Sequence, residues 1–121
     1  RIERTIWRLT SHAPEPPTAV IDAWVAARAR HPVSATNALR QLLAAARYRA
    51  PAVAPHPHIL LLASQNDRLV NSRCSQAIAR GWQCDLALHP QAGHDLPLDA
   101  PRWVLEQVQQ WLCRVAAAKH L

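Results

Sequence analysis

The second half of the chain alternates between short apolar runs and segments of helical periodicity. An apolar run in a strand predicted over 58–63 breaks into the polar turn 64–67, which is typical of a strand buried on both faces of a parallel sheet. A helix is predicted over 72–81, with Gly81 as its C-terminal cap. The alternation of apolar and polar residues over 84–89 predicts a second short strand. Together these elements make a βαβ unit.

A final helix is predicted to begin at Pro101, with Asp99 as its N-cap because a carboxylate can accept a hydrogen bond from a free helical N–H. Apolar residues recur at helical spacing along it and are predicted to form its buried face: Val104, Val108, Trp111, Leu112 and Val115. Two parallel strands with helices leave open sheet edges, and a two-stranded sheet is only marginally stable in water.

The first half of the chain is predicted to be helical. Residues 1–9 carry apolar residues at helical spacing, and a second helix is predicted over 18–30, ended by Pro32. A third helix is predicted over 35–48, with Ser34 as its N-cap. Its leucines and one alanine are expected to be buried, while its arginines face solvent: Leu39, Leu42, Leu43 and Ala46 against Arg40 and Arg47. The proline-rich stretch 50–58 then forms an extended connector.

Two residues just beyond the predicted strands are the candidates for chemistry. Asp67 follows the first strand, and His94 lies 27 residues downstream on a second loop. Since parallel crossovers are right-handed, both loops return to the same sheet edge, where open α/β sheets carry their reactive groups. We therefore expect Asp67 to hydrogen-bond and orient the His94 imidazole, with Gly93 permitting the turn that exposes the ring. Asp85 is a poorer candidate for the acid because it lies within a strand.

Both residues could also have ordinary structural roles. Asp67 could be a turn aspartate that caps the following helix, and His94 could be a surface histidine. Against them stands a resemblance: the stretches Leu60–Val70 and Ala92–Leu98, with the motifs D-R-L-V and A-G-H-D-L-P-L, are similar to the C-terminal part of the α/β-hydrolase family. The similarity covers about residues 57–115. In that family the chain order is nucleophile, acid, histidine, and the histidine sits in a Gly-His turn. The resemblance implies that Asp67 is the acid and His94 the base of a catalytic triad.

The resemblance also implies a fold class and a domain organisation. The fold would be α/β, namely the C-terminal part of an α/β-hydrolase sheet (strand-helix-strand-helix) preceded by cap-like helices. Residues 1–50 would be the cap-like segment and 51–121 the hydrolase core segment. The full-length protein would hydrolyse a small ester or acyl substrate through an acyl-enzyme. The cap helices would line the acyl pocket, with Trp24, Leu39 and Leu43 as apolar candidates.

One part of the family pattern is missing. The nucleophile elbow G-x-S-x-G requires two glycines four positions apart, whereas this chain has only Gly81 and Gly93. The same shortage excludes a Rossmann fingerprint and a Walker A loop. No serine here is a credible nucleophile, so the 121 residues alone are predicted to be inactive. The sequence also lacks methionine, and we expect it to begin within a longer protein whose N-terminal half carries a Ser, Cys or Asp nucleophile.

The formal net charge of +6, almost all from arginine, allows a second interpretation. A stand-alone helical interaction or nucleic-acid-binding module could use the arginines of the helices 18–30 and 35–48. However, the arginines are scattered singly, with no basic run and no aromatic residues interleaved among them. A solvated arginine-rich surface is the simpler prediction.

The cysteines and histidines predict no cofactor and no metal site. Cys74, Cys84 and Cys113 form no C-x-x-C pair, and an odd count indicates reduced thiols in a cytoplasmic protein. His56 and His58 have no cysteine or carboxylate at ligand spacing. No apolar run approaches the ~18 residues that suggest a membrane span, so no membrane partner is expected.

Overall fold

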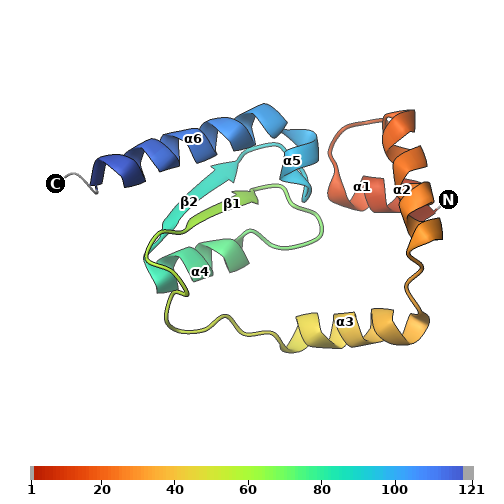
Figure 1. Ribbon diagram of the computed structural model, residues 1–121, viewed down its shortest axis with the longest axis horizontal. Coiled ribbons are helices and arrows are strands. Elements are labelled where there is room, and N and C mark those ends of the chain that lie inside the picture. Colours follow the sequence, from red (N-terminus) through yellow and green to blue (C-terminus); the bar gives the residue numbers. More distant parts are fainter. Residues whose placement is uncertain (1, 119–121) are drawn as a thin grey trace.

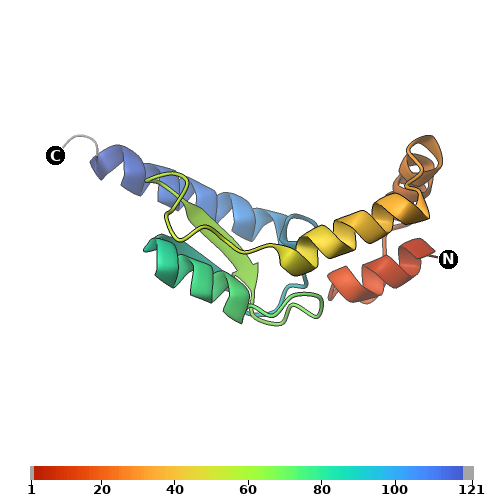
Figure 2. The same cartoon turned by 90° about the horizontal axis from the view of Figure 1, so that it is seen from below.

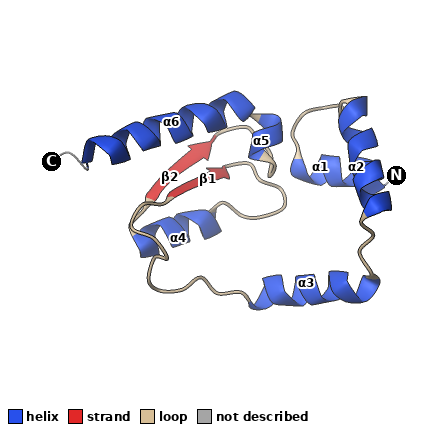
Figure 3. Ribbon diagram, in the orientation of Figure 1, coloured by secondary structure: helices blue, strands red, loops and turns tan. Residues whose placement is uncertain are grey.

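The computed structural model describes residues 2–118, and helices make up 57% of the structure (Figure 1, Figure 3). The elements, in chain order, are α1 (Ile2–Thr10), α2 (Thr18–Arg30), α3 (Ala35–Arg47), β1 (Leu60–Ser64), α4 (Arg73–Trp82), β2 (Asp85–His89), α5 (Leu96–Asp99) and α6 (Pro101–Ala118). Within residues 2–118, no helix combines the length and the apolar character needed to cross a membrane.

The two strands pair in parallel, as the predicted βαβ unit requires. The register runs from Leu60 opposite Asp85 to Ser64 opposite His89. The carboxyl ends of β1 and β2 therefore meet at one edge of the sheet. Helix α4 lies on one face of the sheet and α6 on the other (Figure 1, Figure 2). Leu96 of α5 and Ala79 of α4 are buried near the strands and form part of the small core.

The predicted fold class, part of an α/β-hydrolase sheet, is wrong. The residues described here form six helices and a sheet of two strands, so the protein is mostly helical. The two strands predicted from the sequence pattern, over 58–63 and 84–89, are present as β1 and β2. The further strands of a hydrolase sheet are not found among the described residues. The helices on its two faces cover this narrow sheet only in part: four of the five residues of β1 are partly buried, and Ser64 alone is fully buried.

Helices α1 and α2 pack on each other through two tryptophans and one ion pair. The indole rings of Trp7 and Trp24 lie 6.1 Å apart, and Trp7 is buried. Glu3 is also buried, where its carboxylate pairs with Arg28 at 2.8 Å. The apolar residues that recur at helical spacing along α1 are exposed: Ile2, Ile6 and Leu9. Packing between aromatic rings and one ion pair therefore decides which face of α1 is buried.

The prediction that α3 buries its leucines is also wrong. No residue of α3 is buried, and Leu39, Leu42 and Leu43 are all exposed. The predicted N-cap is confirmed, since the Ser34 hydroxyl accepts a hydrogen bond from the Asn37 N–H at 3.2 Å. Local capping thus fixes where α3 begins, but no other element of the described chain covers its apolar face.

Helices α4 and α6 each differ from the predictions in one respect. Helix α4 continues past Gly81 to Trp82, and its C-cap is Gln83 in the left-handed conformation (φ 51°). Helix α6 begins at Pro101 as predicted, but Leu112, expected on its buried face, is 52% exposed. The short helix α5 was predicted as a loop.

Candidate active site

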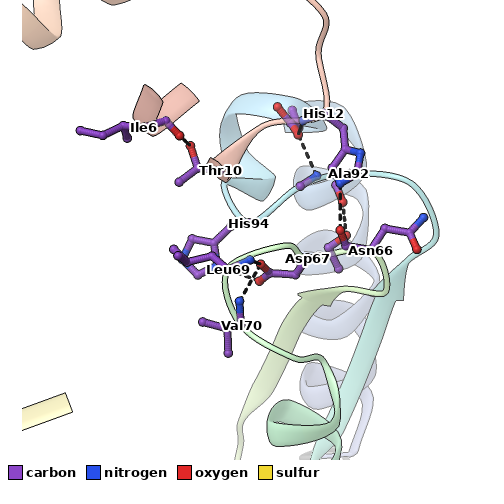
Figure 4. Close-up of polar contacts among 12 residues, drawn as sticks. Ile6, Thr10, His12, Asn66, Asp67, Leu69, Val70, Ala92 and His94 are labelled. Carbon is purple, nitrogen blue, oxygen red and sulfur yellow. Dashed lines mark hydrogen bonds and ion pairs between the residues drawn. The ribbon is translucent and has the colours of Figure 1, made fainter. Parts of the chain in front are cut away.

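Asp67 and His94 meet at the carboxyl edge of the sheet, as the sequence predicted. The distance between His94 Nδ1 and Asp67 Oδ2 is 2.7 Å, and the two side chains face each other from neighbouring loops (Figure 4). An ionised carboxylate only accepts hydrogen bonds, so Nδ1 is the donor. In the neutral ring this leaves Nε2 with a free lone pair. The Asp67 side chain is 11% exposed and that of His94 is 41% exposed, so the base is open to solvent while the acid is sheltered.

The Asp67 carboxylate is fixed by its own loop. Its Oδ1 accepts backbone hydrogen bonds from Leu69 at 2.7 Å and from Val70 at 2.9 Å (Figure 4). Burial raises the pKa of Asp67, but these two N–H groups and His94 outweigh the effect, so the pKa lies below its ordinary value of 3.8. The carboxylate is therefore ionised and oriented at neutral pH. Asp67 also has the alternative role of a turn aspartate. Its Oδ1 accepts from the backbone of the turn, while its Oδ2 accepts from His94.

The two loops are tied to each other behind the Asp67–His94 pair. The buried Ser64 hydroxyl donates to the carbonyl of Ala92. The Asn66 side chain donates to the carbonyl of Pro90 at 2.8 Å. His89, at the end of β2, accepts on Nδ1 from the Ala92 N–H at 2.8 Å. The bonds of Ser64 and Asn66 hold the end of β1 and its loop against the loop after β2, and the bond to His89 fixes the start of that second loop. The spacing of Asp67 and His94 therefore does not depend on their own hydrogen bond alone.

Asp99 is a polar residue of this region whose role the sequence did not reveal. It was predicted as the N-cap of the last helix, but its carboxylate accepts hydrogen bonds from other segments and from no N–H group of α6. Oδ1 accepts from the Ser11 hydroxyl, while Oδ2 accepts from the backbone N–H of His12 at 2.9 Å and of Gly93 at 2.7 Å. Burial raises the pKa of Asp99, but these three donors outweigh the effect and lower it from 3.8. No local pattern indicates a partner 88 residues away.

Both lowered carboxyl pKa values predict how stability depends on pH. A carboxyl whose pKa is depressed in the folded state stabilises it above the unfolded pKa of 3.8, and this contribution is lost as pH falls through the folded value. We expect the free energy of unfolding to fall as the pH is lowered from about 5 towards 2. In the double variant Asp67→Asn, Asp99→Asn the fall should be shallower. Urea denaturation at several pH values measures both slopes, and equal slopes would contradict the assignment.

Gly93 is required for space and not for an unusual backbone conformation. No glycine of the described chain has a positive φ, so the turn at Gly93 does not use the backbone freedom that only glycine has. A Cβ at this position would collide with the carbonyl oxygen of Thr10 and would lie 2.9 Å from Cα of Ser11. The loop that carries His94 therefore lies directly on the backbone that follows α1.

The region holds a carboxylate and an imidazole, but within residues 2–118 no hydroxyl or thiol is hydrogen-bonded to that imidazole. Three hydroxyls on the segments that contact these loops are engaged elsewhere. Thr10 donates to the carbonyl of Ile6 (Figure 4), Ser11 to Asp99, and Ser64 to the carbonyl of Ala92. No serine, threonine or cysteine of the described chain hydrogen-bonds to His94. The same residues contain no group of three or more His, Cys, Asp or Glu side chains placed to hold a metal ion. Asp85, the poorer candidate acid, forms an ion pair in which its Oδ2 lies 3.4 Å from Nη2 of Arg114.

The predicted pocket residues are not gathered around this pair. Trp24 packs on Trp7, while Leu39 and Leu43 lie on the exposed face of α3. A hollow of about 480 Å³ lies along α2 and the loop after it, lined by Val25, Arg28, Ala29, Pro32 and Val33. It contains neither Asp67 nor His94. Within residues 2–118, the three apolar residues that the resemblance assigned to an acyl pocket therefore do not lie together beside Asp67 and His94.

Comparison with known proteins adds no family to this picture. No protein-family model matches the chain, and no curated protein matches it. The chemical reading of Asp67 and His94 therefore depends on their geometry and on the two sequence motifs that contain them.

Proposed function

We propose that Asp67 and His94 are the acid and base of a nucleophile–Asp–His triad that hydrolyses a small ester or acyl substrate. The observation that supports this is the 2.7 Å hydrogen bond between a sheltered carboxylate and Nδ1 of an imidazole whose other nitrogen is free to act. A carboxylate placed in this way fixes the tautomer that can accept a proton and stabilises the imidazolium that forms. The D-R-L-V and A-G-H-D-L-P-L motifs, which resemble those of α/β-hydrolases, are the second support.

The proposed reaction moves one proton through His94 in each half. A serine or cysteine nucleophile from the N-terminal half of the same protein attacks the substrate carbonyl carbon, and Nε2 of His94 takes its proton. The imidazolium then protonates the leaving alcohol as the C–O bond breaks, which leaves an acyl-enzyme. Water attacks this ester while giving a proton to His94, and the acid leaves as the nucleophile recovers the proton. With an aspartate nucleophile, His94 would act only in the second half, by activating water.

The test compares two forms of the protein. The 121-residue chain should hydrolyse p-nitrophenyl acetate no faster than free imidazole at the same concentration, because no serine, threonine or cysteine of residues 2–118 is hydrogen-bonded to His94. The product of the complete open reading frame should hydrolyse the ester well above that rate and lose the activity when His94 is replaced by alanine. No hydrolysis by the complete product over several acyl lengths, or full activity of His94→Ala, would overturn the proposal.

The coding sequence immediately upstream of Arg1 provides an independent check. An in-frame G-x-S-x-G after an apolar strand would agree with a serine nucleophile, and Cys or Asp in its place with the other two branches. A start codon directly before Arg1 would remove the source of the nucleophile and count against the enzyme.

Two further parts of the proposal concern partners and location. Binding of nucleic acid is disfavoured because Arg28, on the second helix, is engaged by the buried Glu3 carboxylate. Binding of DNA that falls steeply with log salt would instead support that alternative.

We propose a cytoplasmic location, supported by the three unpaired thiols of Cys74, Cys84 and Cys113.

A further inference from the structure

The segment from the last residue of α1 to His12 contacts both loops that carry the proposed acid and base. On the side of the base, the carbonyl of Thr10 accepts a hydrogen bond from the Asp95 N–H at 2.9 Å. On the side of the acid, His12 Nε2 donates to the carbonyl of Asn66 at 2.8 Å (Figure 4). Asn66 directly precedes Asp67 in the chain, and Asp95 directly follows His94. One short segment thus contacts the immediate neighbour of each proposed catalytic residue.

Asp99 completes this arrangement from a third element. Its Oδ2 accepts from the N–H of His12 and from the N–H of Gly93, and so joins the segment after α1 to the peptide just before His94. Its other oxygen accepts from the Ser11 hydroxyl, which itself accepts from the Ala13 N–H at 3.0 Å. Ser11 is buried, so these bonds are shielded from water.

We infer that the segment Thr10–His12 and Asp99 form a clamp that sets the position of His94 relative to Asp67. In this clamp His12 and Asp99 are positioning residues, since neither hydrogen-bonds to the imidazole or to Asp67. His12 holds the acid loop through Asn66, and Asp99 holds the base loop through Gly93. The catalytic meaning of the clamp rests on the proposed function, but its structural effect on the Asp67–His94 hydrogen bond does not.

The clamp explains why an acid and a partly exposed histidine keep one geometry. His94 is 41% exposed, and a surface histidine would gain little from one hydrogen bond to a carboxylate in competition with water. Fixing the backbone on both sides of the pair lowers the entropy cost of that bond, because the two side chains are already directed at each other. The clamp also connects the α1–α2 pair to the site, since Thr10 is the last residue of α1.

The tautomer of His94 reports on the clamp without any need for activity. A histidine side chain free in water prefers the Nε2–H tautomer, whereas a bond to Asp67 requires Nδ1–H. The ring nitrogen shifts of His94, read from long-range ¹H–¹⁵N spectra of the 121-residue chain at a pH where the ring is neutral, give the ratio of the two forms. The signals are assigned by their loss in His94→Gln.

We expect Nδ1–H to predominate in the wild-type chain and Nε2–H to become the major form in Asp99→Ala and in His12→Ala. In Asp99→Asn the amide oxygen can still accept from His12 and Gly93, and the amide can donate to Ser11, so the ratio should remain near that of wild type. Asp85→Asn is the matched control for loss of one carboxylate. Its side chain lies beside Arg114 and outside the clamp, and its ratio should not change.

The inference is overturned if Asp99→Ala and His12→Ala keep the wild-type ratio while folded, or if Asp85→Asn changes it as much as Asp99→Ala does. Thermal unfolding curves establish that each variant is folded at the temperature of the spectra, and Asp99→Asn serves as the folded variant should Asp99→Ala not fold. In that event an Asp99→Asn chain with mainly Nε2–H would likewise overturn it.

Kinetics of the complete gene product separate this inference from the proposed function. There we expect Asp99→Ala to lower kcat by about 10- to 100-fold with KM nearly unchanged, because small displacements of a catalytic group have costs of this size. If the tautomer of His94 changes in Asp99→Ala but the complete gene product hydrolyses no ester, the proposed function is refuted and the clamp is supported. Normal hydrolysis with an unchanged tautomer would refute the clamp and leave the function.

Discussion

Replacing Asp67 by asparagine should lower kcat of the complete gene product by about 10⁴-fold while leaving the fold intact. The side chains are nearly the same size, and the asparagine oxygen can still accept from the N–H groups of Leu69 and Val70. The atom facing His94 then becomes an amide NH₂, which donates. His94 Nδ1 must accept from it, so the proton moves to Nε2, where it prevents the imidazole from taking the proton of a nucleophile.

The matched control is Asp85→Asn, which removes the same charge at the other end of the sheet and should leave kcat within about threefold of wild type. Steady-state hydrolysis of p-nitrophenyl acetate measures both variants, and the ring nitrogen spectra should show His94 as Nε2–H in Asp67→Asn only. Retention of wild-type kcat by a folded Asp67→Asn protein in which His94 has changed tautomer would show that this pair is not the acid and base.

The meeting of Asp67 and His94 could be predicted because it follows from local patterns and one topological rule. Each residue lies just after a short strand. Leu60 of β1 pairs with Asp85 of β2, 25 positions later in the chain, and this separation leaves room for a parallel crossover through α4. Parallel strands then bring their carboxyl ends to one edge irrespective of how the rest of the chain packs. The catalytic role of the pair remains a prediction, since its geometry alone does not reveal a nucleophile.

The clamp could not be predicted, because its contacts link positions that no periodicity connects. Asp99 has the sequence context of an N-cap, and the cap hydrogen bond would be local. The structure instead gives its two oxygens three donors from Ser11, His12 and Gly93. Likewise, apolar spacing on α1 and α3 showed which residues could be buried together, but not whether a partner surface existed. Trp7 and Glu3 are buried on α1, and the leucines of α3 remain exposed.

The error in fold class has a related cause. The resemblance was carried by loops at the strand ends, and such loops report on a site more than on the number of strands behind it. The two stretches with strand periodicity did become β1 and β2, whereas the large sheet was inferred from the family and not from any further strand pattern in this chain. A similar pair of loops can therefore be supported by a structure that is mostly helical.

Replacing Gly93 by alanine should destabilise the folded chain by about 1–3 kcal/mol, the usual cost of forcing an extra carbon into a packed site. The new Cβ would meet backbone atoms of Thr10 and Ser11, which cannot rotate aside as a flexible side chain could. The segment after α1 must then move away from the loop of His94, and the hydrogen bonds of Asp99 to both sides should weaken with it. Urea denaturation measures the loss.

The chain provides its own control in Gly81, its other glycine. Gly81 lies inside α4, and an added Cβ there meets nothing within 4 Å. Gly81→Ala should therefore stabilise the protein by about 0.5–1 kcal/mol, because alanine restricts the unfolded chain and favours the helix. Opposite signs for the same chemical change would locate the cost at the contact between the His94 loop and residues 10–11. If Gly93→Ala is as stable as wild type and His94 keeps its Nδ1–H tautomer, that close approach has no part in holding the proposed base.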